Sequence, residues 1–282
     1  MGDIAARLRG LAEEHVKPDG QKVLLVCMSA VQQVAEETAH TRRQVELAAL
    51  RAQIVPLRYG RNLGTVGYEG QIALLESTVG VVGVGGLGGW VVEGLARMGV
   101  GHLVIIDGDV FQEGNLNRQA FCLEGNLGQP KVEAARDRVA AVNGAVEVKA
   151  FQTRAGEREM SALLRGCNVI VDALDALPTR LVLQRVASEL GVPLVHGAIA
   201  GFVGQVMTVF PGDPGLVALY GQKAPPEHGI EMAWGNPSAT PLMVAAWQIH
   251  EVVKLVTGKG EPLRRRMLFL DGEVGVVDVL QV

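Results

Sequence analysis

From residue 77 onward, short runs of apolar residues alternate with longer stretches in which apolar residues recur every three or four positions. The short runs predict buried strands, and the longer stretches predict amphipathic helices. The first strands are predicted at Val79–Val84, Leu103–Asp107, Val146–Phe151 and Asn168–Asp172. Helices are predicted between and after them at Leu87–Met98, Lys131–Val142, Glu157–Arg165 and Pro178–Leu190. This alternation predicts an α/β fold with a Rossmann-like, doubly wound, mostly parallel sheet flanked by helices.

The remainder of the chain continues the pattern around one long break. Strands are predicted at Leu194–His196, Val206–Phe210, Arg266–Leu270 and Val274–Leu280, and a helix at Pro241–Val256. Between them, residues 212–240 are rich in proline and glycine and predict a surface loop. Loops of this length in a compact domain usually serve a function, and we expect the same here.

Residues 1–57 differ in composition, being charged and rich in Gln and Glu. Ser29–Glu37 and Thr41–Arg51 predict two short helices, the second begun by a capping box of Thr41 and Gln44. We therefore expect a small N-terminal helical extension (1–57) before a nucleotide-binding domain (58–282). Two helices with a short link also resemble a helix-turn-helix, but few base-reading residues accompany them. A packing arm or a cap that docks a partner is the favoured interpretation.

Composition narrows the class of protein. The 282 residues are 48% hydrophobic with 36 glycines, which suits a buried parallel sheet with many tight turns. A net charge of −4 gives no reason to expect nucleic acid as a partner. Three cysteines without a Cys-x-x-Cys pair favour a reducing compartment. With no signal-peptide core, and with prolines and glycines breaking the uncharged stretch 191–212, we expect a cytoplasmic protein without a membrane partner.

The strongest motif is a glycine-rich turn. The strand near residue 80 ends in Gly83-Val-Gly85-Gly86-Leu-Gly88, and a helix follows at once. Such a turn brings backbone N–H groups to a phosphate chain at the positive end of a helix. Asp107 ends the next strand, about 20 residues beyond the turn, where an acid is expected to bind a ribose. A structural turn and a strand-end cap are the plain alternatives, and the combination favours nucleotide binding.

Charged side chains follow the next strand ends. Asn115, Arg118 and Lys131 come after the strand that ends at Asp107, and Asp175 comes after Asn168–Asp172. Two cations and an amide beside a phosphate turn suit a triphosphate, and an acid among them would hold Mg²⁺. Other interpretations of these residues stay open. Arg118 or Lys131 could be a solvated surface charge, and Asp109 could be a turn residue or could support the metal site. Asp172 and His196 are expected to be structural.

Several motifs in register resemble those of one superfamily. The segments Gly83–Gly88, Asp107-Gly-Asp109, Asn115-Leu-Asn-Arg-Gln119 and Gly128-Gln-Pro-Lys131 resemble the ubiquitin-activating-type adenylyltransferases, and most closely the bacterial MoeB/ThiF/HesA group. Arg58-Tyr-Gly-Arg61-Asn upstream, and Asp175 followed by Arg180, are also similar to that family. The resemblance runs from about residue 58 to the end.

The resemblance implies ATP- and Mg²⁺-dependent adenylation. The C-terminal Gly-Gly carboxylate of a ubiquitin-like sulfur carrier, as in molybdopterin or thiamine biosynthesis, would attack the α-phosphate and release pyrophosphate. By motif, the enzyme would be a homodimer in which Arg61 reaches the ATP of the other subunit. The resemblance also implies that the phosphates are contacted by Gly83, Gly85, Gly86 and Gly88, and that the ribose hydroxyls are bound by Asp107. It implies further that the triphosphate is held by Asn115, Arg118 and Lys131, and that Mg²⁺ is bound by Asp175. The chemistry agrees independently, because a carboxylate is ionised at pH 7 and needs no general base.

The chain also departs from the family pattern. The Cys-x-x-Cys pairs that hold zinc in many relatives are missing, and residues 168–282 contain no cysteine. We therefore expect neither zinc nor a thioester cysteine, and Cys122 is expected to be a small core residue. Ala176 replaces an asparagine that often follows the metal-binding acid, which puts one adenine or phosphate contact in doubt. The alternatives are the same ATP chemistry on tRNA or a peptide, a nucleotide-binding scaffold, and an NAD-dependent oxidoreductase.

Overall fold

The computed structural model describes residues 2–16, 20–221 and 231–282. Its large sheet contains β4 (Thr78–Val82), β5 (His102–Ile106), β6 (Glu147–Phe151), β7 (Val169–Asp172), β8 (Leu194–Ala200), β9 (Val203–Val209), β10 (Arg266–Asp271) and β11 (Val276–Gln281). Among the described residues, these eight strands lie in the order β11-β10-β9-β8-β7-β4-β5-β6. The five strands β8, β7, β4, β5 and β6 pair in parallel. On the other side of β8, each of the strands β9, β10 and β11 pairs antiparallel with its neighbour. The predicted Rossmann-like, mostly parallel sheet is confirmed.

The strand order reverses between β4 and β7. From β4 the chain continues through β5 to β6 on one side, and it returns to β7 and β8 on the other side. The loops that leave the carboxyl ends of β4 and β7 therefore diverge, and a crevice opens between them. On a doubly wound sheet this is the expected place for a bound nucleotide.

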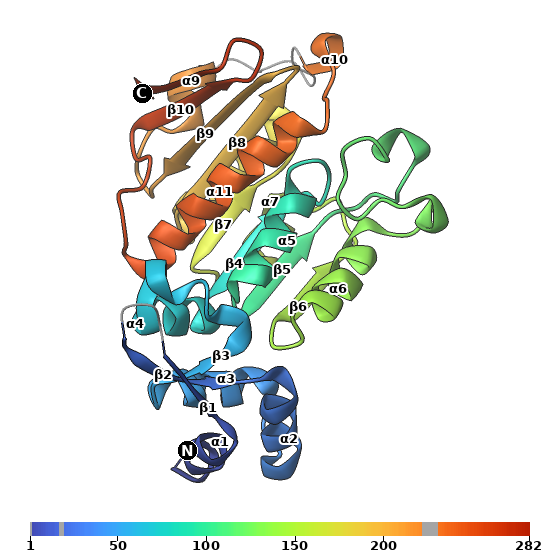
Figure 1. The fold of residues 1–282 in the computed structure, drawn as a ribbon. Coiled ribbons are helices and arrows are strands. Elements are labelled where there is room, and N and C mark those ends of the chain that lie inside the picture. Colours follow the sequence, from blue (N-terminus) through green and yellow to red (C-terminus); the bar gives the residue numbers. More distant parts are fainter. Residues whose placement is uncertain (1, 17–19, 222–230) are drawn as a thin grey trace.

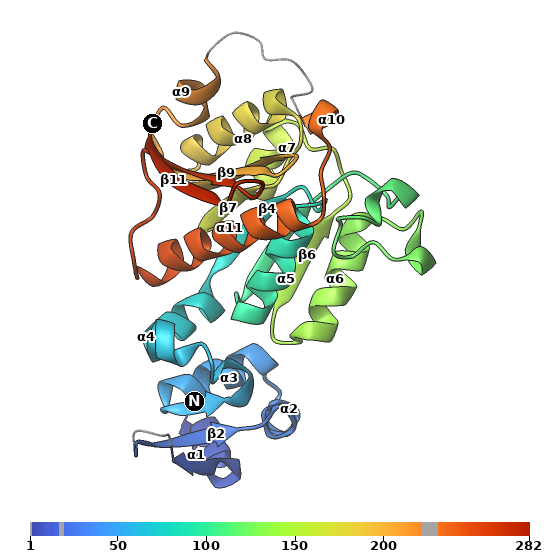
Figure 2. The same cartoon turned by 45° about the horizontal axis from the view of Figure 1, so that its top comes forward.

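Helices cover both faces of the sheet (Figures 1 and 2). One face carries α4 (Leu63–Glu76), α5 (Gly88–Met98), α6 (Lys131–Val142) and α11 (Ala239–Thr257), and the other carries α7 (Glu157–Leu163), α8 (Leu177–Glu189) and α9 (Leu216–Tyr220). Side chains of β5 alternate, with Leu103 and Ile105 packed toward α5, and Val104 and Ile106 toward α7. Because both faces are buried, the central strands have unbroken apolar sequences.

The predicted elements of residues 77–282 are found at or near their expected positions, and the structure adds helices both before and within this range. The helix α4 is not predicted by the pattern, since its glycines lower helix propensity, and its backbone is interrupted at Gly67 with a φ of +70°. The predicted loop 212–240 contains α9 and the short α10 (Glu231–Trp234), while its residues 222–230 lie outside the described residues. Within the described residues, every helix is too short or too polar to cross a membrane.

The extension is a lobe at the amino ends of the parallel strands (Figure 1). It contains α1 (Gly2–Leu11), β1 (Glu13–Val16), β2 (Lys22–Val26), α2 (Met28–Thr38), α3 (Arg42–Arg51) and β3 (Ile54–Pro56). Both predicted helices and the capping box of Thr41 and Gln44 are confirmed. The expectation of helices alone is corrected, because β1, β2 and β3 form a small sheet. The exposed strand β1 is too short and too charged to show an alternating pattern.

A buried polar cluster joins the extension to the main domain. Glu46 of α3 is 2% exposed, and its Oε2 accepts a hydrogen bond from the hydroxyl of Tyr59 at 2.9 Å. That hydroxyl also accepts one from Nδ2 of Asn143, at the end of α6, at 3.0 Å. Arg58 pairs with Glu46 and donates to Asn143. The short 3-10 helix η1 (Leu57–Tyr59) is thus held from both sides.

Candidate active site

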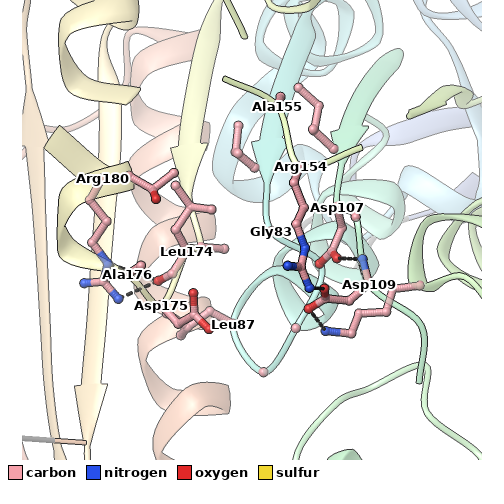
Figure 3. A pocket seen from close by; sticks show the side chains of 18 of the residues that line it. Gly83, Leu87, Asp107, Asp109, Arg154, Ala155, Leu174, Asp175, Ala176 and Arg180 are labelled. Carbon is pink, nitrogen blue, oxygen red and sulfur yellow. Dashed lines mark hydrogen bonds and ion pairs between the residues drawn. The ribbon is translucent and has the colours of Figure 1, made fainter. Parts of the chain in front are cut away.

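A cleft of about 620 Å³ opens at the carboxyl ends of the parallel strands, where the strand order reverses (Figure 3). Its walls are the turn after β4, the loops after β5 and β6, the start of α6 and the loop between β7 and α8. A volume of this size suits a ligand as large as a nucleotide. The predicted site residues that line the cleft are Gly83, Gly85, Gly86, Asp107, Arg118, Lys131, Asp175 and Ala176.

The turn between β4 and α5 contains glycines of two kinds. Gly83 has a φ of +92°, and a Cβ there would lie 2.5 Å from the carbonyl oxygen of Ala173. A Cβ on Gly88 would lie 1.8 Å from the carbonyl oxygen of Gly83, so both positions need glycine for the chain to fold. A Cβ on Gly85 or Gly86 would meet only side-chain atoms, at 3.6 Å or more. Packing therefore tolerates a side chain at these two positions, and their bare backbone faces the cleft near the positive end of α5.

Asp107 follows β5 and joins two loops of the cleft. Its Oδ2 accepts a hydrogen bond from the backbone N–H of Val84 at 2.7 Å, and its Oδ1 accepts one from the N–H of Asp109 at 2.8 Å. Each carboxylate oxygen keeps a second lone pair for a ligand. The carboxylate is therefore held beside the glycine turn and can still accept from the hydroxyls of a ribose.

Two cations share the carboxylate of Asp109 (Figure 3). Nζ of Lys131 lies 3.2 Å from Oδ2, and Nη2 of Arg154 lies 3.0 Å from Oδ1. Burial would raise the pKa of Asp109, but Lys131 and Arg154 outweigh that effect and hold the pKa below its ordinary value. Asp109 is therefore ionised near neutral pH and keeps both cations at the cleft.

Arg118 lies over the glycine turn. Its Cγ and Cδ stand 3.6 Å from the position that a Cβ of Gly86 would take. Its Nη1 donates to the carbonyl oxygen of Gly114 at 2.9 Å and to Oδ1 of Asn117 at 2.8 Å. Arg118 and Lys131 thus both line the cleft, where they could neutralise phosphate oxygens.

The opposite wall presents one carboxylate, Asp175 (Figure 3). Its loop is fixed by Arg180, whose Nε donates to the carbonyl oxygen of Leu174 at 3.0 Å. Ala176, the next residue, adds no side-chain polar atom. Within the described parts of the chain, no cluster of three or more His, Cys, Asp or Glu residues could hold a metal ion by itself. A nucleotide-bound Mg²⁺ needs only one or two carboxylates besides phosphates and water, so Asp175 fits that role.

Three predicted site residues lie elsewhere. Gly88 lies behind the turn, against Gly83. Oδ1 of Asn115 accepts from the backbone N–H of Gln112 at 3.0 Å, which shapes the loop that carries Arg118.

Arg61, the third, is exposed and takes part in no hydrogen bond or ion pair with the described residues. It follows Tyr59, whose ring packs against Gly99 at the far end of α5. Since α5 has 11 residues, this end lies about 16 Å from the end at the cleft.

The polar residues that line the cleft but are absent from the predicted set include Gln119, Arg154, Arg180 and Asn236. Arg154 follows β6 at the same sheet edge as Asp107, so its position after a strand was a usable signal. Gln119 and Asn236 come from long loops, whose paths cannot be read from an apolar pattern.

Asp172 and His196 lie beneath the cleft and are fully buried. Oδ1 of Asp172 accepts from the backbone N–H of Leu174 at 3.0 Å, and its Oδ2 lies 2.7 Å from Nδ1 of His196. Burial lowers the pKa of His196 even beside this carboxylate, so the imidazole is neutral. Cys122 packs in the main core, and burial raises the pKa of its thiol. These three residues therefore support the fold, as the sequence predicts.

Residues 59–282 match the ThiF family. The SAMP-activating enzyme E1 of Haloferax volcanii is 39% identical over 217 residues, which cover 76% of this chain and 80% of that protein. The sulfur carrier protein adenylyltransferase of Thermus thermophilus is 35% identical over 76% of this chain and 82% of its own. The molybdopterin-synthase adenylyltransferase of Salmonella typhimurium is 32% identical over 76% and 88%. The chain spans about half (47%) of a longer relative, the adenylyltransferase and sulfurtransferase MOCS3-1 of Zea mays.

Solved structures with low sequence identity share the fold. The crystal structure of PaaA aligns with a TM-score of 0.67 at 17% identity, over 97% of this chain and 99% of that chain. The E. coli MccB structure with ATP aligns with a TM-score of 0.69 at 19% identity, over 79% of this chain and 71% of that chain. The PaaA alignment takes in most of the extension as well as the main domain.

The family match and the relatives agree with the cleft. The relatives from Haloferax volcanii, Thermus thermophilus and Salmonella typhimurium are each above 30% identity over 76% of the chain, and the last two are named adenylyltransferases. This chain is accordingly an adenylyltransferase, and it belongs to the ThiF family.

Proposed function

We propose that this enzyme uses ATP and Mg²⁺ to adenylate the C-terminal glycine carboxylate of a ubiquitin-like sulfur carrier protein that ends in Gly-Gly. The names of the relatives, which specify SAMP, a sulfur carrier protein and molybdopterin synthase, support a carrier of this kind. The observation that carries the proposal is the distribution of charge around the glycine turn. Arg118, Lys131 and Arg154 line one side of the cleft, and Asp175 lies on the other.

In the proposed reaction, a carboxylate oxygen attacks the α-phosphorus, and the bond from this phosphorus to the bridging oxygen of pyrophosphate breaks. The products are an acyl-adenylate and pyrophosphate. Because the carboxylate is already ionised, no general base is needed. The residues must instead align the reactants and neutralise charge: Arg118 and Lys131 at phosphate oxygens, Asp107 at the ribose, and Gly85 and Gly86 through their backbone N–H groups. Mg²⁺ held by Asp175 would supply further positive charge at the phosphates.

The proposal includes no zinc and no thioester step. Residues 168–282 contain no cysteine, and Cys122 lies in the core, so the acyl-adenylate would be released or handed to another protein. We place the reaction in the cytoplasm, since the three cysteines, Cys27, Cys122 and Cys167, are free thiols.

We also propose that the active unit is a homodimer in which Arg61 contacts the ATP of the other subunit. Two observations support this arrangement. Arg61 follows Tyr59, which packs at the end of α5 that lies about 16 Å from the cleft end of this helix. Its guanidinium is also exposed and takes part in no ion pair with the described residues.

ATP–pyrophosphate exchange tests the proposed reaction. We expect labelled pyrophosphate to enter ATP only when Mg²⁺ and a Gly-Gly-tailed sulfur carrier are both present. Removal of the last glycine of the carrier should abolish exchange. Exchange that requires tRNA or a peptide instead would identify another acceptor. ATP binding without exchange with any acceptor would leave a nucleotide-binding scaffold, and either result contradicts the proposal.

A further inference from the structure

No polar partner holds the carboxylate of Asp175 in the cleft. The residue is exposed, and its side chain takes part in no hydrogen bond or ion pair with the described residues. Its direction therefore depends on Leu174, the residue before it, whose two backbone groups are both held. The carbonyl oxygen of Leu174 accepts from Nε of Arg180 at 3.0 Å, and its N–H donates to Oδ1 of Asp172 at 3.0 Å.

The carboxylate of Asp172 is bound at both of its oxygens. The residue is fully buried, and its Oδ2 lies 2.7 Å from Nδ1 of His196 on the neighbouring strand β8. A buried carboxylate is costly unless hydrogen bonds compensate for its lost hydration. While His196 occupies Oδ2, the carboxylate cannot turn away from Leu174 without leaving a buried polar atom unpaired. His196 therefore locks the hydrogen bond that shapes the loop after β7.

The second ring nitrogen of His196 determines which nitrogen carries the proton. Burial lowers the pKa of His196, so the imidazole is neutral, with one nitrogen donating and the other accepting. Its Nε2 lies 3.3 Å from Nε2 of Gln205, an amide nitrogen that can only donate. We therefore assign the proton to Nδ1, which donates to Asp172, and the lone pair to Nε2, which accepts from Gln205.

We propose that His196 is a positioning residue that acts on the metal site through Asp172. Its hydrogen bond holds the carboxylate of Asp172, which in turn holds the N–H of Leu174. The turn fixed in this way presents the carboxylate of Asp175 to Mg²⁺. This inference rests on the proposed function, in which Asp175 binds the Mg²⁺ that accompanies ATP. It adds that metal affinity depends on His196, which does not line the cleft.

Metal binding to the full-length enzyme tests this role. Mn²⁺ replaces Mg²⁺ and is titrated into the enzyme saturated with a non-hydrolysable ATP analogue, and free Mn²⁺ is measured by electron paramagnetic resonance. His196→Leu, which keeps the bulk but removes the donor, should weaken Mn²⁺ binding by about tenfold, the value of one net hydrogen bond. Affinity for the analogue without metal should change by less than about twofold. His196→Asn should restore most of the metal affinity, since its amide can donate to Asp172.

Thr208→Val is the matched control, because Thr208 is also fully buried and donates to a carboxylate, that of Glu251, outside the cleft lining. Both variants should lose stability in urea unfolding, but the control should keep the metal affinity of the wild type. If His196→Leu also keeps it, His196 is merely structural and the inference is overturned. If His196→Leu does not fold, Gln205→Met should weaken Mn²⁺ binding by about threefold, because Nε2 of His196 loses its donor, and unchanged binding would overturn the inference.

A double variant tests whether His196 acts through Asp175. In the Asp175→Ala background, His196→Leu should weaken Mn²⁺ binding no further, because the ligand that it positions is already gone. A second loss of the same size would show that His196 acts elsewhere, and this result would overturn the inference.

These titrations need no acyl acceptor, so the inference and the proposed function can fail separately. If no Gly-Gly protein supports exchange but the His196 variants show the expected metal affinities, the proposed acceptor is wrong and this inference stands. If exchange proceeds and the His196 variants bind Mn²⁺ as the wild type does, the proposed function stands and this inference alone is wrong.

Discussion

A methyl group added to the glycines of the turn would meet different neighbours at different positions. This difference separates the glycine that folding requires from the one that ligand binding requires. At Gly83 a Cβ would clash with the backbone of Ala173, in a conformation that L-residues rarely adopt. At Gly86 it would meet only the stem of Arg118, at an ordinary contact distance. Folding therefore requires glycine at position 83. At position 86, glycine is instead required by the proposed phosphate site.

We expect Gly83→Ala to lower the free energy of unfolding by roughly 1–3 kcal/mol, because it combines a backbone clash with a strained φ. Gly86→Ala should stay within about 0.5 kcal/mol of the wild type. Its ATP affinity should nevertheless fall by about tenfold, because the methyl group would stand where the phosphates approach the backbone. Urea unfolding and calorimetry measure the two effects. The reverse pattern would show that Gly86 serves packing.

Asp175→Ala should lower the Mg²⁺-dependent exchange rate by about a hundredfold, since it removes the proposed protein ligand of the metal. Binding of ATP without Mg²⁺ should be unaffected or slightly tighter, because a negative charge is removed from the cleft. Asp137→Ala, on the exposed face of α6, is the control. Full exchange by the Asp175 variant would contradict the metal role.

At this scale, the sequence predicts the residues that follow strand ends but not those that depend on loop paths. Gly83, Asp107 and Asp175 line the cleft because the carboxyl ends of parallel strands meet at one edge. The position of Gln119 depends on the irregular loop after β5, whose course has no apolar period to reveal it. Asn236 depends in the same way on the segment before α11.

At the scale of elements, the strands buried on both faces were predictable and the extension was less so. Unbroken apolar runs between amphipathic stretches indicate β4, β5 and β7 directly. The extension has a core of its own, but β1 is exposed throughout and leaves no such signal. Its attachment to the main domain combines apolar contacts of Leu47 and Leu50 with the buried carboxylate of Glu46, which contacts Tyr59 and Arg58.

The pH dependence of unfolding tests this attachment. Burial raises the pKa of Glu46 above its unfolded value, even though Arg58 opposes the shift. The folded state therefore binds this proton more tightly. Binding of this proton adds to the free energy of unfolding. The contribution is fully present below the unfolded pKa of about 4.3, and it is lost as pH rises through the higher folded pKa.

We therefore expect the free energy of unfolding of the wild type to fall relative to that of Glu46→Gln as pH rises from about 4 to 8. Urea unfolding at a series of pH values measures the difference between the two proteins. The variant also lacks the attraction between ionised Glu46 and Arg58, but this attraction is already part of the net upward shift of the pKa and does not change the sign. A constant difference across the range would contradict a buried, proton-binding Glu46.

At the scale of the whole molecule, the extension lies at the amino ends of the parallel strands (Figure 1). The residues that line the cleft follow the carboxyl ends of the same strands. We propose a boundary between residues 57 and 58, and the family match begins at residue 59. Arg61, just beyond that boundary, lies at the end of the domain away from its own cleft. If Arg61 acts on ATP, it does so in a second copy of the chain.

Complementation tests that arrangement. Arg61→Ala and Asp175→Ala should each be nearly inactive, and a mixture that exchanges subunits should recover about a quarter of the wild-type exchange rate. Half of the dimers would be mixed, and each mixed dimer would contain one intact site. Recovery would be absent if Arg61 and Asp175 served the same chain's cleft, and an equimolar mixture of Arg61→Ala with wild type is the control.

The central claim is that the cleft transfers AMP from ATP to a carboxylate. A sulfur carrier labelled with ¹⁸O in its terminal carboxylate, incubated with the enzyme, ATP and Mg²⁺, tests it most directly. After cleavage of the acyl-adenylate with hydroxylamine, mass spectrometry should find one ¹⁸O atom in the AMP, because the attacking oxygen stays on the α-phosphorus. Unlabelled AMP, or ADP as the nucleotide product, would contradict the account.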